Sequence, residues 1–210
     1  MKRRLFTKAF ACAFLVAATL SAQAQAKTKT DADQAIDFIR TLAEQAVDVL
    51  QDTDAPLSTR EEGVQKLLRD NLDLKTMGQF ALGAQWRSAS PDSREEYLKL
   101  FSEYVIRGYA RRLGGYSGQT FKVEGSGPAG KYDVLVNTVI VTDDQPEIKA
   151  GWRVRTSSDG SLKIIDLVVE GVSMLQTERA QFDSVMQTNG LPGLITSLQD
   201  RLKRIDEQSS

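Results

Sequence analysis

The chain has 210 residues, with 27 lysines and arginines against 28 aspartates and glutamates, one cysteine and no histidine. The lack of histidine excludes Ser-His-Asp and Cys-His catalytic sites and histidine-ligated zinc, and the single Cys12 excludes an intramolecular disulfide or a cysteine-ligated metal. With 26% charged and 41% hydrophobic residues, the composition is typical of one globular domain rather than a disordered chain.

Residues 1–26 have the three parts of a secretory signal peptide. The first eight residues carry four positive charges and no acid, and an apolar run with small-residue sites follows. The run is shorter than the roughly 20 residues that span a bilayer, which argues against a membrane anchor. We therefore expect cleavage after Ala26 or, as the alternative, after Ala24, leaving a single domain over residues 27–210.

Removal of this segment changes the charge of the chain. It takes away four of the 27 basic residues and the only cysteine, and it leaves 23 basic against 28 acidic residues. A negative net charge argues against a nucleic-acid partner, which requires a basic surface. The sequence also offers no donor set for a metal, so we expect neither a metal nor a cofactor.

Four helices are predicted before the first strand. In the first and the fourth, apolar residues recur at steps of three and four, which is the period of a helix with one buried face. Three N-caps are predicted, namely Ser58, Asp73 and Ser90, and Ser58 forms a capping box with Glu61. Gly83 is placed to end the third helix. The predicted ranges are 31–52, 58–71, 74–82 and 91–114.

Extended segments follow, rich in β-branched and aromatic residues. Their connections, among them a predicted hairpin loop over residues 125–130, are too short for parallel crossovers and therefore predict an antiparallel meander. Two further helices close the chain, which makes the predicted fold α+β. The predicted strands are 119–124, 131–141, 147–156 and 162–170, and the predicted closing helices are 172–189 and 191–207.

The second predicted strand is apolar on both faces. Val134 and Val136 lie on one face, and Leu135 and Val139 lie on the other. Such a strand is covered on both sides. Two interpretations remain open from this pattern alone, namely a filled core and an apolar ligand pocket between the sheet and the helices.

Catalytic candidates are few. Asp166 is mid-strand, and Tyr109 and Tyr116 are near each other in sequence, so an aspartate base with a tyrosine oxyanion donor is conceivable. The alternative is an aspartate paired with a neighbouring arginine and two tyrosines in the core. We favour the alternative and predict no catalytic residue.

Three stretches of the chain carry a family resemblance. They read LKTMGQFALGAQWRSASP over residues 74–91, YARRLGGYSGQ over residues 109–119, and KIIDLVVEGVS over residues 163–173, followed by Arg179 and Phe182. Together they resemble the MlaC family of periplasmic phospholipid-binding proteins, also called toluene-tolerance auxiliary proteins. The likeness runs from about residue 31 to residue 202, with one departure: Glu178 stands where the family usually has tyrosine.

The resemblance implies a fold and a function. The implied fold is a cone-like, nuclear-transport-factor-like α+β domain, in which helices flank a curved four-stranded antiparallel sheet over a deep apolar pocket. The implied function is to carry phospholipid in the periplasm between an outer-membrane lipoprotein complex and an inner-membrane ABC transporter complex with MCE domains, which maintains outer-membrane lipid asymmetry. A hopanoid-associated carrier of the same family and a pocket enzyme of isomerase or hydrolase type are the alternatives.

Candidate pocket residues follow from the apolar faces of the predicted elements. Arg111, Arg112 and Arg179 are basic candidates for contact with a lipid phosphate near the mouth. The residues expected to line the pocket are Phe80, Trp86, Val105, Tyr109, Val136, Val139, Trp152, Val154, Leu167, Val169, Met174 and Phe182.

Overall fold

The structure is a computed structural model that describes residues 31–52, 54–114, 118–142 and 145–207. The expected signal peptide, its cleavage sites and Tyr116 lie outside these residues. In chain order the elements are a first helix over residues 31–50, α2 (Leu57–Asn71), α3 (Leu74–Leu82), α4 (Gln85–Ser88), α5 (Pro91–Gly114), β1 (Thr120–Ala129), β2 (Asp133–Thr142), β3 (Gln145–Thr156), β4 (Leu162–Val169), β5 (Val172–Ser173) and α6 (Met174–Glu207).

The sheet is an antiparallel meander in the order β1-β2-β3-β4-β5, which confirms the predicted α+β class and topology. The predicted number of four strands is wrong, because the two residues of β5 add a fifth. Glu170 (φ 49°) and Gly171 (φ 79°) form a tight turn that places Val172 opposite Val169. A two-residue strand has too short a pattern to be recognised in the sequence.

The first strand is longer than predicted. The glycine-rich run over residues 125–130, expected to be a loop, is mostly strand, and the turn falls at residues 130–132. A bulge between Val123 and Gly125 shifts the register with β2. β1 is at the edge of the sheet, where glycine, Pro128 and a bulge are all tolerated.

Most predicted helix ends are confirmed. The Thr76 amide donates to Asp73 Oδ1 over 2.9 Å, and the Ser93 amide donates to Ser90 Oγ over 3.2 Å, so both predicted caps are present. The prediction for Ser58 is wrong, because α2 begins one residue earlier, directly after Pro56. Proline fixes its own φ near the helical value and can lead the chain into a helix without a side-chain cap.

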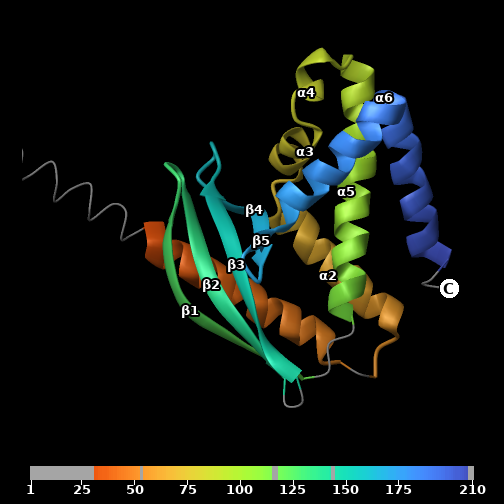
Figure 1. The fold of residues 1–210 in the computed structure, drawn as a ribbon. Helices are drawn as coiled ribbons and strands as arrows, with labels where there is room; N and C mark the ends of the chain where they lie inside the picture. The colour runs from red at the N-terminus through yellow and green to blue at the C-terminus, as the bar shows by residue number, and fades with distance from the viewer. Residues whose placement is uncertain (1–30, 53, 115–117, 143–144, 208–210) are drawn as a thin grey trace, which may run out of the picture.

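Two differences concern the other helices. The four-residue α4 was not predicted, since one turn has no apolar period. The two closing helices are the two halves of α6, which are separated at Gly190 by a left-handed φ of 64°. Figure 1 shows the first half of α6 crossing α5 and the second half running back alongside it.

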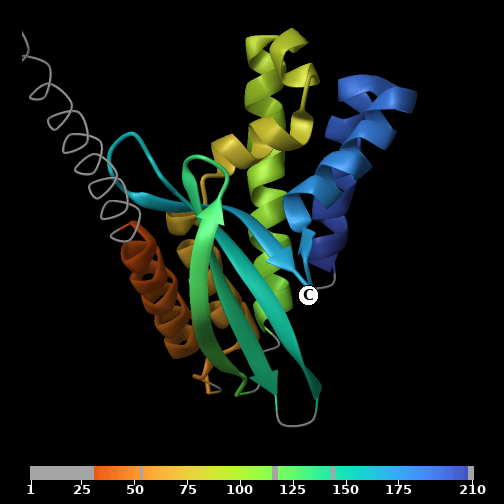
Figure 2. The ribbon, with the colours of Figure 1, turned by 60° about the vertical axis from the view of Figure 1, so that its left-hand side comes forward.

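The described helices lie on one side of the sheet. Figure 2 shows the strands in front of α2 and α5, with the first helix beside β1 and the other side of the sheet free of described helices. We call the helix-covered side, which carries Val136, Trp152 and Val154, the inner face, and the open side the outer face. The main core cluster between the inner face and the helices consists of Ala35, Ile39, Leu72, Met77, Ala81, Leu82, Tyr97, Phe101, Val105, Val136, Val154, Ile164, Leu175, Phe182, Met186, Leu194 and Leu198.

Three aromatic rings form the centre of the helical part. Tyr97 and Phe101 of α5 lie 5.7 Å apart, and Phe182 of α6 meets them edge-on at 6.3 and 6.2 Å. The Tyr97 hydroxyl donates to the carbonyl oxygen of Gly78 in α3 over 3.0 Å. Burial raises the pKa of Tyr97, so this hydroxyl keeps its proton. The cluster therefore joins α3, α5 and α6.

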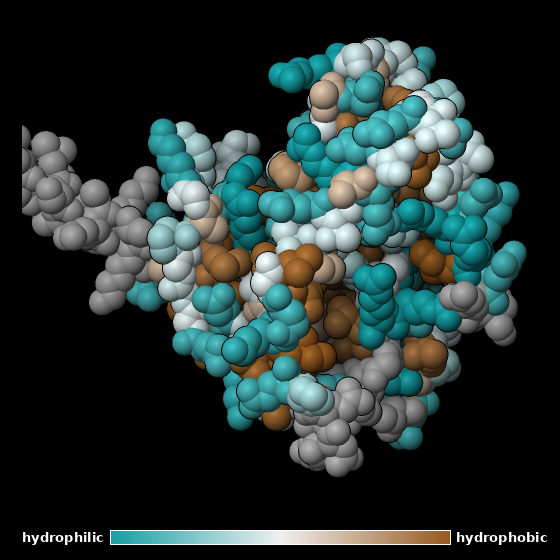
Figure 3. All heavy atoms as spheres, viewed as in Figure 1, coloured by the Kyte–Doolittle hydropathy of each residue, from teal (hydrophilic) through white to brown (hydrophobic). Residues whose placement is uncertain are grey.

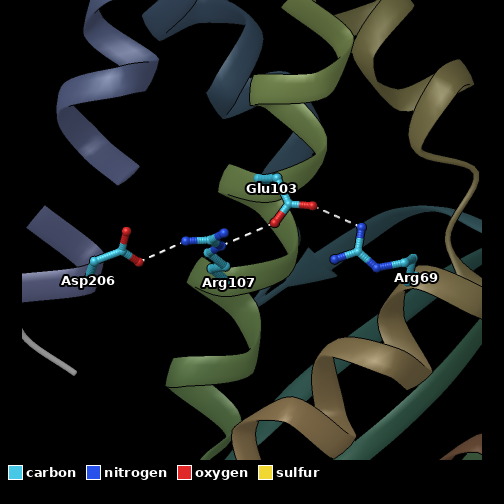
Figure 4. A network of polar contacts seen from close by, with 4 residues as sticks. All are labelled: Arg69, Glu103, Arg107 and Asp206. Carbon is cyan, nitrogen blue, oxygen red and sulfur yellow. Dashed lines mark hydrogen bonds and ion pairs between the residues drawn. The ribbon is translucent and has the colours of Figure 1, made fainter. Parts of the chain in front are cut away.

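A chain of ion pairs joins three helices on the surface (Figure 4). Glu103 of α5 accepts from Arg69 of α2 over 2.9 Å and from Arg107 over 3.1 Å, and Arg107 donates to Asp206 of α6 over 2.8 Å. Burial raises the pKa of Glu103, but the two arginines outweigh that effect and hold the pKa below its usual range. Because these side chains are partly exposed, the network orients the helices more than it stabilises them.

A more buried ion pair lies on the outer face. The Asp133 side chain is 2% exposed, and its carboxylate accepts from Arg153 Nε over 2.7 Å and from Arg155 Nε over 2.6 Å. Burial raises the pKa of Asp133, but these hydrogen bonds and charges lower it more strongly, so the pKa lies below its usual value. Asp133 therefore ties β2 to β3 through charge.

We expect Asp133→Asn to lower the free energy of unfolding by about 2 kcal/mol at neutral pH, because the charge-assisted bonds with two partly exposed arginines are lost. A lowered carboxyl pKa stabilises the fold above the ordinary aspartate value of about 4, and this contribution disappears as pH falls through the lowered pKa. Urea unfolding at pH 7 and near pH 3 should show the difference shrink. Asp37→Asn, at an exposed pair, is the control and should change stability little; an equal effect would contradict the argument.

Candidate functional site

An apolar hollow opens between the sheet and α5. Figure 3 shows it near the middle of the face seen in Figure 1, lined by hydrophobic residues and rimmed by hydrophilic ones. The strands curve around one side of it, and the C-terminal half of α5 borders the other. The hollow thus lies under the inner face of the sheet, where the sequence pattern left open a pocket.

The inner face beside α5 is apolar, and its polar atoms are paired. Trp152 lies directly opposite Leu167, and Ala150 lies opposite Val169, so these four side chains share the inner face of β3 and β4. Trp152 Nε1 donates to Thr138 Oγ1 over 3.0 Å, and that hydroxyl donates to the Ala150 carbonyl oxygen over 2.9 Å. A wall without unpaired buried polar groups suits an apolar ligand.

Leu167 and Val169 differ from their neighbours in packing. Both are half-buried and lie outside the main core cluster, whereas Val136 and Val154 on the same face are almost completely buried within it. The end of the sheet that carries Leu167 and Val169 therefore has apolar surface that the helices leave uncovered.

The structure brings some of the expected lining residues together and separates others. Val105 of α5 belongs to the main core cluster and Tyr109 packs against it, while Val154 and Phe182 are enclosed in the core. Met174 is half-buried at the start of α6. The expected lining residues that lie on the inner face are Val136, Trp152, Val154, Leu167 and Val169.

Three expected lining residues lie elsewhere. Val139 is 3% exposed but points to the outer face, opposite to Val136, with Lys122 and Lys149 as its cross-strand neighbours. Phe80 is 40% exposed on α3, and Trp86 lies on α4 beside the far end of α5. The second apolar face of β2 is thus covered by flanking side chains, since the helices of the described residues lie on the other side.

The Asp166 side chain is buried and hydrogen-bonded within the fold. Its carboxylate accepts from Ser173 Oγ over 2.6 Å and from the Leu175 amide over 3.1 Å, and its side chain is buried. Ser173 directly precedes α6 and Leu175 lies in its first turn, where unpaired amides and the helix dipole favour a negative charge. The partners of Asp166 are therefore a helix start rather than the arginine we expected.

We expect Asp166→Ala to lower the free energy of unfolding by about 2 kcal/mol, because the amide of Leu175 and the Ser173 hydroxyl lose a buried acceptor. Asp166→Asn keeps one oxygen acceptor and should lose less. Chemical unfolding of the three proteins measures this order. A variant of unchanged stability that had lost a turnover reaction would contradict the capping role and revive the enzyme hypothesis.

Two further depressions are present. A groove of about 560 Å³ lies between the first helix and β1, and its lining includes Val47, Phe121, Val123, Arg40 and Glu44. A cleft of about 460 Å³ lies between α5 and the two halves of α6. We call the latter the arginine cleft; its lining is Tyr104, Val105, Gly108, Tyr109, Arg111, Arg112, Glu178, Arg201, Arg204 and Ile205.

Tyr109 connects the arginine cleft with the apolar interior. It lines the cleft and also packs against the main core cluster. Burial, together with the negative charges of Glu178 and Asp166, raises the pKa of Tyr109 to about 12 despite the opposing charge of Arg112. The hydroxyl is therefore protonated at neutral pH and can donate a hydrogen bond.

No sequence pattern predicts this cleft. Arg111 and Arg112 are among the predicted phosphate contacts, whereas Arg201 and Arg204 of α6 are not. Their spacing of three residues puts them on one face of α6, which is a detectable signal. What brings that face to α5 is the reversal at Gly190, and a sequence pattern does not specify the angle of such a reversal. Arg179 lies elsewhere, with its guanidinium 5.1 Å from the Phe80 ring.

Neither a metal site nor a membrane span is found in the described part of the chain. Across residues 31–52, 54–114, 118–142 and 145–207, no three acidic side chains converge to hold a metal ion. Within the same ranges, no helix combines the length and the apolar character needed to cross a bilayer.

Comparisons with known proteins agree with this geometry. The model of the MlaC family, described as MlaC protein, matches residues 40–200. The Haemophilus influenzae protein named intermembrane phospholipid transport system binding protein MlaC is 29% identical over 132 residues. These residues make up 61% of this chain and 61% of that protein, so the chain spans less than two thirds of the length of this relative.

A solved structure shows the same fold. The phospholipid-binding protein from Ralstonia solanacearum, in complex with a phospholipid, matches with a TM-score of 0.72 at 24% identity and covers 82% of this chain and 98% of its own. At that identity the likeness establishes the α+β architecture. The match of the family model over most of the sequence establishes more: this chain belongs to the MlaC family.

Proposed function

We propose that this chain is exported, loses residues 1–26, and carries phospholipid through the periplasm as a single domain over residues 27–210. In this proposal it exchanges lipid with an outer-membrane lipoprotein complex and with an inner-membrane ABC transporter complex that has MCE domains. The exchange would maintain the lipid asymmetry of the outer membrane. The chain itself would bind lipid and catalyse no reaction.

The observation that carries the proposal is membership of the MlaC family in a chain with an apolar hollow under its sheet. The relative from Haemophilus influenzae is named as a binding protein of phospholipid transport, and the Ralstonia solanacearum protein was solved with a phospholipid. Both names support a lipid as the occupant of the hollow. The structural role of Asp166 as a helix cap supports binding rather than catalysis.

The energetics explain why such a carrier is needed. Burial of one methylene is worth about 0.8 kcal/mol, so two acyl chains of roughly fifteen methylenes each represent about 24 kcal/mol of apolar surface exposed to water. A carrier that replaces water around the chains removes most of this barrier without covalent chemistry. The protein needs only an apolar wall and a mouth where the headgroup stays near water.

We assign the wall to the inner face and to α5. Trp152, Leu167 and Val169 form the sheet side of the proposed site, and Val105 and Tyr109 form the helix side. Leu167 and Val169 support this assignment most strongly, because the helices leave their apolar surface uncovered.

Uptake of lipid from a membrane tests the proposal. The exported chain, stripped of bound lipid, is incubated with phosphatidylglycerol vesicles, and the vesicles are then removed by centrifugation. We expect lipid phosphorus to remain in the supernatant at close to one molecule per chain. Supernatant phosphorus no higher than that of an unrelated protein of similar size would overturn the proposal.

A further inference from the structure

The arginine cleft concentrates positive charge. Four arginines and one glutamate line it, and they come from α5 and from both halves of α6. Its volume of about 460 Å³ is within the range of small-ligand sites. The second half of α6 brings Arg201 and Arg204 toward α5, so the charges surround a common space.

The one carboxylate of the cleft is already neutralised. Glu178 Oε1 accepts from the Tyr104 hydroxyl over 3.1 Å, and Glu178 Oε2 lies 3.7 Å from Arg201 Nη1. Arg201 also donates to the Tyr104 oxygen over 3.1 Å and to Gln181 Oε1 over 3.3 Å. Arg201 and Glu178 thus form a fixed internal pair within the cleft.

Arg112 and Arg204 are the arginines available to a ligand. Both are exposed, and within the described ranges neither forms an ion pair with a carboxylate. The Arg112 guanidinium lies 6.0 Å from the centre of the Tyr109 ring, which holds it beside the cleft. Guanidinium groups bind phosphate oxygens through paired, charge-assisted hydrogen bonds.

The cleft also shares two residues with the apolar interior. Val105 and Tyr109 belong both to its lining and to the hydrophobic packing around the main core. A ligand with an anionic group in the cleft therefore has an apolar wall within one side chain of that group. An amphipathic phosphate ester fits this combination better than a wholly polar anion does.

We propose that the arginine cleft is a phosphate-binding site in which Arg112 and Arg204 bind the phosphate group of the carried lipid. The choice of a lipid as its source rests on the proposed function. The same site chemistry accepts inorganic phosphate, so the experiment separates the two sources.

The test compares two short-chain lipids that differ only in the headgroup. Dihexanoylphosphatidylglycerol, dihexanoylglycerol and inorganic phosphate are each titrated into the exported, delipidated chain by calorimetry. We expect the phosphorylated lipid to bind the wild type about tenfold more tightly than the diacylglycerol, as charge-assisted hydrogen bonds imply. In the double variant Arg112→Ala/Arg204→Ala, the ratio of the affinity for dihexanoylphosphatidylglycerol to that for dihexanoylglycerol should fall to about one, because the hydrogen bonds to the phosphate are lost. The affinity for dihexanoylglycerol should stay unchanged.

The matched control is Lys75→Ala/Lys99→Ala, which removes the same charge from exposed positions on α3 and α5 and should keep the ratio. Equal affinity of the wild type for both lipids, or a ratio that survives in Arg112→Ala/Arg204→Ala, would overturn the phosphate site and leave the carrier function standing. Binding of phosphate alone, dependent on Arg112 and Arg204, would support the site and refute the carrier. Binding of none of the three probes would refute both.

Discussion

The Leu167→Asp variant should retain less than one tenth of the phospholipid that the wild-type chain carries after purification. Leu167 is half-buried on the inner face, directly opposite Trp152 and outside the main core cluster. An aspartate here stays hydrated while the hollow is empty and loses its water when acyl chains enter. Burying an unpaired carboxylate costs several kcal/mol, and about 1.4 kcal/mol already lowers binding tenfold.

Val168→Asp is the matched control for this experiment. Val168 is the next residue of β4, is also half-buried, and points to the outer face opposite Gly151. The same carboxylate is therefore placed one residue away, on the face opposite to the described helices. Lipid phosphorus per chain measures retention, and circular dichroism checks that both variants are folded. Equal retention by two folded variants would show that the inner face is not the lipid wall.

Phe182→Ala should lower the free energy of unfolding by about 4 kcal/mol, the largest loss of stability that we expect from one substitution. Phe182 is completely buried, and its ring meets Tyr97 and Phe101 edge-on. Truncation removes these ring contacts and leaves a cavity where α3, α5 and α6 meet. Urea unfolding followed by circular dichroism measures the loss.

Phe80→Ala is the corresponding control at an exposed phenylalanine. Phe80 is 40% exposed, and Arg179 lies over its ring, so we expect a loss of only about 1 kcal/mol or less. Phe80 and Phe182 were both expected to line the pocket, and the comparison also tests that expectation. If Phe182→Ala were as stable as Phe80→Ala but bound less lipid, Phe182 would belong to the lipid wall rather than to the core.

Local sequence signals determined much of the fold. Asp73 and Ser90 cap helices as predicted, and short connections specified the meander of β1 to β4. These features depend on a few neighbouring residues, which is why they can be read from the chain. The fifth strand and the length of β1 could not be read in this way, because a two-residue strand and a bulged, glycine-rich edge strand show no clear alternation.

The candidate site was predictable only in part. Alternation along a strand shows that Val136 and Val139 are both apolar, but it does not show which face the helices cover. Periodicity likewise cannot separate Val154, which is packed in the core, from Leu167, whose surface is uncovered. The arginine cleft depends on the reversal of α6 at Gly190, which joins residues nearly a hundred positions apart.

The most direct test of the central claim is native mass spectrometry of the exported chain, purified from the periplasm without detergent. A carrier with an occupied hollow predicts a series of ions heavier than the bare chain by the mass of one phospholipid, which collapses to the bare chain after extraction with organic solvent. The Leu167→Asp chain should show the bare mass from the start. A wild-type chain found only at its bare mass, with nothing extractable, would contradict the account.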